Sequence, residues 1–124
     1  MKKKFLRVLT QDSNELSNEE WEDIAIFMKQ FPNRIKRSSG ANYYKSKLLY
    51  SPFGISFVTR ALDNQKKCIG LTTLTKKLFK IQNKAYEAFE LGDSYVSKSF
   101  QGQGIYIKIL EDALSNENLK KTSE

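Results

Sequence analysis

A short run of glutamines and glycines, Gln101-Gly102-Gln103-Gly104, stands directly before a segment with the spacing of an amphipathic helix. The first turn of a helix leaves backbone N–H groups without intrahelical partners, and the helix dipole adds partial positive charge there. Glycine lets a ligand come close to the backbone because it has no side chain. The run therefore predicts a site for an anion such as a phosphate. It is not a Walker loop, because no Gly-Lys-Ser/Thr follows, and it lacks the third glycine of the dinucleotide fingerprint.

Side chains that could act as a base, a nucleophile or a metal ligand are few. The chain has no His, which removes the commonest general base and the commonest transition-metal ligand. Its single Cys, Cys68, excludes an intrachain disulfide and a Cys-only zinc site, and no metal is expected. Cys68 lies in an apolar segment and is expected to be a small core residue.

The elements that must position the glycine run form one domain. A capping box of Ser17 and Glu20 marks the start of the first helix, and apolar residues at helical spacing from Trp21 to Phe31 predict its buried face. The later strands are joined by short turns and predict an antiparallel meander. In chain order we expect a strand over 5–10, a helix from Ser17 to Pro32, a short helix over 42–50, strands over 55–59, 68–75 and 86–96, a helix over 105–114, and a polar tail over 115–124. The last helix should carry its apolar residues near one face, namely Ile105, Ile109, Ala113 and Leu114.

The glycine run and this order of elements resemble one known family. Gln101-Gly102-Gln103-Gly104-Ile105 is similar to the acyl-CoA signature of the GNAT acetyltransferase superfamily, Arg/Gln-x-x-Gly-x-Gly/Ala, although Tyr106 stands where that signature has a small residue. The resemblance covers most of residues 5–115. It implies an α/β (α+β) fold with a mostly antiparallel sheet and helices on both faces.

The resemblance also implies a cofactor and the residues that hold it. The co-substrate would be acetyl-CoA, and its pantetheine arm would pair with backbone groups of Tyr95, Val96 and Ser97. Tyr106 would either pack outward or narrow the pyrophosphate site. The pyrophosphate would rest on backbone N–H groups of Gln101, Gly102, Gln103, Gly104 and Ile105, extending to Tyr106.

The implied reaction is transfer of an acetyl group from the thioester to an amine, which needs a base to deprotonate the ammonium. The acids on or beside the strand before the glycine run are Glu87, Glu90 and Asp93. Because a central strand is a poor place for an acid unless it lines a cleft or is paired, we expect Glu90 to be the base, with Asp93 as second choice. The alternative for either acid is an ion pair with a neighbouring Lys.

A complete GNAT domain continues with a fifth strand, a further helix and a hairpin, whereas this sequence ends at Glu124. We therefore expect a single partial GNAT domain over residues 1–124, shortened after the helix that follows the signature. The alternatives are a second chain that pairs with the exposed edge strand, including a homodimer, and a binding relic without turnover.

The charge is uneven, because residues 33–84 hold twelve Lys and Arg and a single acid within a chain of net charge +7. Such a stretch favours an anionic partner, and Arg34, Lys36 and Arg37 favour an anionic small-molecule amine as acceptor. The alternative function is a non-catalytic basic module that binds RNA, another polyanion or a protein, although no RNA-binding sequence pattern supports a nucleic-acid partner. Aromatic residues that could stack on bases lie in the same stretch, namely Tyr43, Tyr44, Tyr50 and Phe53.

The start of the chain has a basic flank, but its apolar run is broken by Arg7 and is too short for a signal peptide. No run approaches the roughly 20 apolar residues that cross a bilayer. We therefore expect no membrane segment and a cytoplasmic location, in keeping with the single Cys.

Overall fold

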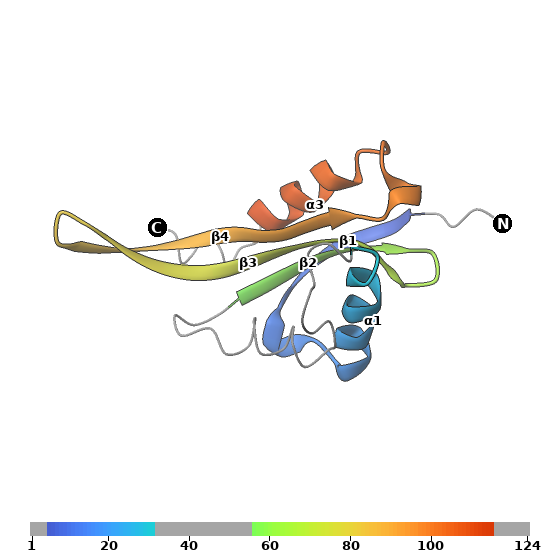
Figure 1. Ribbon diagram of the computed structural model, residues 1–124, viewed down its shortest axis with the longest axis horizontal. Coiled ribbons are helices and arrows are strands. Elements are labelled where there is room, and N and C mark those ends of the chain that lie inside the picture. The colour runs from blue at the N-terminus through green and yellow to red at the C-terminus, as the bar shows by residue number, and fades with distance from the viewer. Residues whose placement is uncertain (1–4, 32–55, 116–124) are drawn as a thin grey trace.

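The computed structural model describes residues 5–31 and 56–115, which form one antiparallel sheet with a helix on each face (Figure 1). Within these ranges the strands follow the order β1-β2-β3-β4. The α+β class and helices on both faces are as expected from the sequence. The elements are β1 (Phe5–Asp12), η1 (Ser13–Glu15), α1 (Asn18–Met28), β2 (Ser56–Asp63), β3 (Cys68–Ile81), β4 (Lys84–Val96), η3 (Lys98–Phe100) and α3 (Ile105–Leu114).

Helix α1 begins at the predicted capping box. The Glu20 N–H donates to Ser17 Oγ at 3.1 Å, and the Ser17 N–H donates to Glu20 Oε1 at 2.9 Å. The predicted apolar face packs on the sheet, where Trp21 is 1% exposed, and its members contact Val58 and Leu71. The helix ends at Met28, before the Pro32 that was expected to stop it.

Helix α3 covers the opposite face of the sheet. Ile105, Ile109 and Ala113 are buried, as their spacing predicts, whereas Leu114 was wrongly assigned to this face and is 58% exposed. The helix lies directly over Gly70 of β3, because a Cβ at that position would stand 2.7 Å from Ile109 Cδ1. Gly70 therefore permits the close approach that fixes α3 on the sheet.

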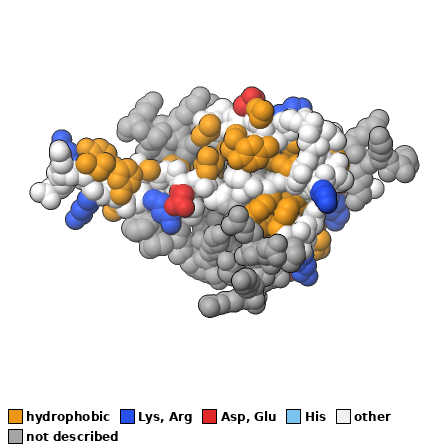
Figure 2. All heavy atoms as spheres, turned by 45° about the horizontal axis from the view of Figure 1, so that its top comes forward, with side chains coloured by type: hydrophobic (Ala, Val, Ile, Leu, Met, Phe, Trp, Pro, Cys, Tyr) orange, Lys and Arg blue, Asp and Glu red, His pale blue; other side chains and the backbone are white. Residues whose placement is uncertain are grey.

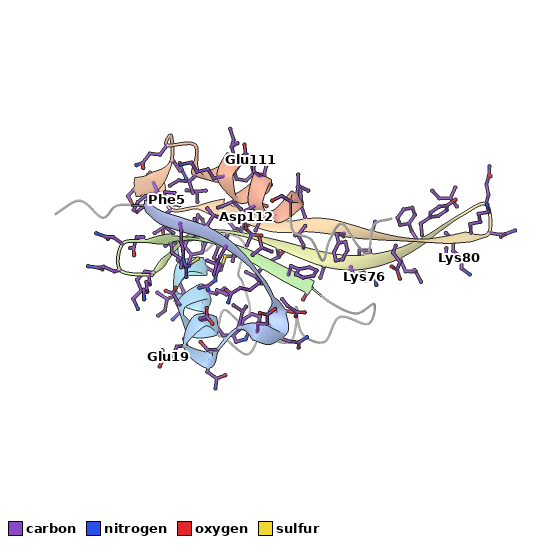
Figure 3. All side chains as sticks on the ribbon, turned by 180° about the vertical axis from the view of Figure 1, so that it is seen from behind. Phe5, Glu19, Lys76, Lys80, Glu111 and Asp112 are labelled. Atoms are coloured by element: carbon purple, nitrogen blue, oxygen red, sulfur yellow. The ribbon has the colours of Figure 1, made fainter. Side chains whose placement is uncertain are left out.

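Strands β3 and β4 are longer than the sequence suggested. The last pair between β2 and β3 is Ser56 with Thr75, but β3 continues to Ile81 rather than ending at Thr75. We call residues 76–90 the arm, which extends past the rest of the sheet (Figure 1). The space-filling view shows hydrophobic and basic side chains together on the arm (Figure 2), and Lys76 and Lys80 both lie along it (Figure 3).

Several expectations fall outside the described residues. They are the short helix over 42–50, the basic residues Arg34, Lys36 and Arg37, the aromatic residues between Tyr43 and Phe53, and most of the polar tail. Of the helices that are described, none has the length and apolarity needed to span a membrane.

Candidate functional site

Strand β4 carries a β-bulge shortly before the glycine run. Tyr95 lies opposite Leu71 and Gly92 lies opposite Thr73, so β4 uses three steps where β3 uses two. The extra residue lies in the stretch that contains Asp93 and Ser94. A bulge bends the strand and changes the direction of the backbone groups beside it.

A pair of hydroxyl groups holds this bulge. Ser94 Oγ lies 2.6 Å from Thr72 Oγ1 on β3, and it also donates to the Gly92 carbonyl oxygen at 2.9 Å. The Thr72 hydroxyl lies 3.3 Å from the same carbonyl. The bulge is therefore fastened by side chains that the sequence analysis did not single out.

The chain that leads from β4 to α3 is anchored on both sides. The Ser97 N–H donates to the Ile69 carbonyl at 2.7 Å, and Phe100 is buried. Gln101 Nε2 donates to the Val96 carbonyl at 3.1 Å, which ties the first residue of the glycine run back to the end of the strand. These contacts give the following turn a fixed starting point.

The turn itself is open. Gly102 and Gly104 have φ angles of 84° and 75°, in the left-handed region that favours glycine. A Cβ built on either glycine would have no heavy atom within 4 Å beyond its own chain neighbours, so the backbone here faces free space. The left-handed conformation thus explains why glycine stands at both positions, and the backbone there is accessible.

This turn opens directly into the first turn of α3. Gly104 is the N-cap residue, and its carbonyl accepts the Lys108 N–H at 3.2 Å. The N–H groups of Ile105, Tyr106 and Ile107 therefore precede the first helical hydrogen bond, and Gly104 has no side chain to cap them. Amides without a side-chain cap at the positive end of a ten-residue helix can bind an anion.

Neither a protein-family model nor a curated protein sequence matches the chain, but solved structures do. Glucosamine-6-phosphate N-acetyltransferase from Arabidopsis thaliana superimposes with a TM-score of 0.65 at 10% identity, over 95% of this chain and 78% of that one. An aminoglycoside acetyltransferase from an uncultured soil metagenomic sample gives 0.64 at 19% identity, over 95% and 72%. A GNAT family acetyltransferase from Staphylococcus aureus gives 0.63 at 17% identity, over 95% and 82%.

The chain has the GNAT fold. The same fold forms one region of a much longer fungal protein, a multi-domain β-N-acetylglucosaminidase, of which this chain matches 13% of the length with a TM-score of 0.61. The identities are between 10% and 19%, so the likeness establishes the fold alone.

On this GNAT fold the two predicted bases lie on β4, and their surroundings differ. Glu90 is opposite Thr75, on the face that carries α1, and its side chain is 63% exposed. Its Oε2 lies 4.0 Å from Lys77 Nζ, an exposed ion pair that contributes little to stability. Asp93 belongs to the bulged stretch, where its backbone is described and its side chain is not. Its role as a base stays a prediction, as does that of Glu90.

Cys68 is a buried core residue, as the sequence predicts. It is 6% exposed, and its thiol lies 3.3 Å from the Gly70 carbonyl oxygen. Burial, reinforced by the negative charge of Asp23, raises the pKa of the Cys68 thiol to about 12. Because the thiolate is the nucleophile, this cysteine is inert at neutral pH.

Tyr106, the residue that departs from the family signature, follows the buried Ile105 in the first turn of α3. It is 45% exposed, so its ring is not part of the core beneath the helix. Among the described residues, a hollow of about 460 Å³ is lined by residues of α1, the start of β3 and the same connection, including Ser97 and Phe100. The connection from β4 to α3 is therefore accessible at its turn and along part of its length.

Proposed function

We propose that this chain binds acetyl-CoA at the turn between β4 and α3 and transfers the acetyl group to an amine. The observation that carries the proposal is the exposed turn with left-handed Gly102 and Gly104 at the amino end of α3, directly after a bulged edge strand. The pyrophosphate would accept hydrogen bonds from the N–H groups of residues 101–106. The bulge and the backbone of residues 95–97 would receive the pantetheine arm through those N–H and C=O groups that an edge strand leaves unpaired. The Ser97 N–H and the Val96 carbonyl already have partners within the chain and would not take part.

The first test is binding, which needs no knowledge of the acceptor. At acetyl-CoA concentrations a hundredfold above the dissociation constant, ligand binding should raise the free energy of unfolding by about 2.7 kcal/mol, which a thermal shift detects. Gly102→Ala and Gly104→Ala should weaken binding, since each places a methyl group on the face the phosphates would approach. Leu114→Ala, at the exposed far end of the same helix, is the matched control and should bind normally. No shift at millimolar acetyl-CoA would remove the proposal.

The acceptor proposed is an amino sugar. Two of the structural neighbours are, by name, a glucosamine-6-phosphate and an aminoglycoside acetyltransferase, so both substrates are the first to try. Release of free CoA thiol measures the transfer. With Glu90 as base, Glu90→Gln should lower kcat, and with Asp93 as base, Asp93→Asn should do so. Full turnover of both variants at every pH would require another base.

A further inference from the structure

The arm leaves apolar side chains uncovered. Four of the nine large hydrophobic residues that are exposed in the described ranges lie on it, namely Leu78, Phe79, Ile81 and Tyr86, each between 43% and 53% exposed. Phe79 and Tyr86 stack across the two strands with ring centroids 5.9 Å apart. A two-stranded ribbon is marginally stable alone, so such a ribbon gains from a further strand beside it.

One edge of the arm is open to such a strand. In the described sheet β4 stands at the end of the strand order, so its outer edge has no strand neighbour among these residues. Backbone N–H and C=O groups on an edge strand form a template for another strand. The charges along β4 indicate which strand fits this edge.

A second copy of β4, running antiparallel, fits this edge in one register. With the two-fold axis at Glu87, Lys84 of each copy stands opposite Glu90 of the other, and Ala85 stands opposite Phe89. Placing the axis one residue to either side brings no opposite charges face to face. Directly opposed residues of unlike charge stabilise an antiparallel pair, and like charges destabilise it. The sequence of β4 is thus complementary to itself about Glu87.

Glu87, the residue on the two-fold axis, has a positively charged neighbour in its own chain. Glu87 of each copy would face the other Glu87, which alone would be unfavourable. Lys76 Nζ lies 3.2 Å from Glu87 Oε2 within one chain, so the axis would carry two acids flanked by two lysines. These lysines would offset the repulsion between the two carboxylates.

We propose that two copies of this chain pair through the arm, with β4 against β4 in the register centred on Glu87, to form one continuous sheet. In this register the partner subunit's Asn83 and the partner subunit's Gln82 lie opposite Leu91 and Gly92. The added strand therefore ends where the β4 bulge begins, and the backbone from Tyr95 onward stays free. The partner's turn would then lie beside the site proposed for acetyl-CoA. This consequence rests on the proposed function.

Sedimentation velocity of the full chain, without acetyl-CoA, tests the proposal independently of catalysis. A pair of short strands buries less than the roughly 1,200–2,000 Å² of a stable interface, so the dimer should be weak and its fraction should rise across the micromolar range. Lys84→Glu and Glu90→Lys each put like charges opposite at two positions and should each weaken the dimer about tenfold. Lys80→Glu makes the same charge change as Lys84→Glu on the arm, but on β3, and should leave dimerisation unchanged.

Mixing the two single variants gives the decisive measurement. In a mixed dimer, the glutamate introduced in one chain faces the lysine introduced in the other, and the unchanged Glu90 of the first faces the unchanged Lys84 of the second. Both pairs are then complementary again, so equal amounts of Lys84→Glu and Glu90→Lys should associate like the wild type, while each alone does not. A wild type that is monomeric at every concentration, a Lys80→Glu variant as weakened as Lys84→Glu, or a mixture that fails to associate would each overturn the proposal. Normal acetyl-CoA binding by a monomer would leave the proposed function intact.

Discussion

Replacing Gly70 by alanine should destabilise the protein through one identifiable contact. The new Cβ would lie 2.7 Å from Ile109 Cδ1 and 3.3 Å from Ala61 Cβ, and both of these residues are fully buried. Overpacking of this kind costs about 1–3 kcal/mol. Removing a glycine from a strand offsets about 0.5–1 kcal/mol of this cost, so the net loss of unfolding free energy should be about 0–2.5 kcal/mol.

A second substitution removes the contacting atom. Ile109→Val deletes Cδ1 and should alone cost about 0.5–1.5 kcal/mol. In the double variant the shorter valine leaves room for the methyl group that Gly70→Ala adds, so the two losses should not add, and the coupling should be about 1 kcal/mol or more. Gly92→Ala is the matched control, because its Cβ would meet Thr73 Oγ1 and not Ile109.

Urea unfolding followed by the fluorescence of the single Trp, Trp21, which is 1% exposed, measures all of these variants beside the wild type. Each 1 kcal/mol should also lower Tm by about 2–8 °C for a domain of this size. Strict additivity of Gly70→Ala and Ile109→Val would refute the close contact between α3 and the sheet. So would an equal rescue of Gly92→Ala by Ile109→Val.

Three further outcomes are expected. Burial raises the pKa of Glu20, but hydrogen bonds from Ser17 and the charge of Arg60 outweigh it and leave the pKa lowered. Glu20→Gln should therefore be less stable than the wild type near neutral pH. The difference should begin to shrink as pH falls through the ordinary Glu value of about 4.3 and disappear below the lowered pKa of the folded state, whereas a difference unchanged in acid would contradict the linkage. Cys68, with its pKa raised to about 12, should react with thiol reagents only after unfolding, as a time course with and without urea would show, and rapid labelling of the native chain would count against its burial. Ser94→Ala should weaken acetyl-CoA binding severalfold, as measured by calorimetry, because it removes the hydroxyl that links the bulge to Thr72. Its Tm should change by only a few degrees. Unchanged affinity would show that this hydroxyl pair does not position the cofactor.

Features set by neighbouring residues in the chain could be predicted from the sequence. The capping box of α1 depends on Ser17 and Glu20, three positions apart, and the structure shows both of its hydrogen bonds. The turn at Gly102 and Gly104 was predicted as a place where backbone is exposed, and both glycines have the left-handed conformation that explains their presence. In each case the residues concerned lie within a few positions of one another in the sequence. A short motif is therefore enough to predict the feature.

Features that depend on pairing between strands could not be predicted in the same way. The bulge arises from the register of β4 against β3, and the contact of Ser94 with Thr72 joins residues twenty-two positions apart. Gly92 within a strand was the one signal for it, because glycine in a strand interior often marks a bulge. The length of the arm was missed because β3 beyond Thr75 pairs only with β4 among the described strands, so no buried alternation marks it.

The order of the strands has a consequence for how the chain reaches this fold. Strands β2, β3 and β4 are joined by short turns, so their contacts can form early and locally. Pairing of β1 with β2 is expected to be slower. Asp12 at the end of β1 pairs with Phe57, so the chain between them has to close into a long loop before the two strands can pair. A folding intermediate with β1 still detached would expose the β2 edge, which would add to the β4 edge a second place for chains to aggregate at high concentration.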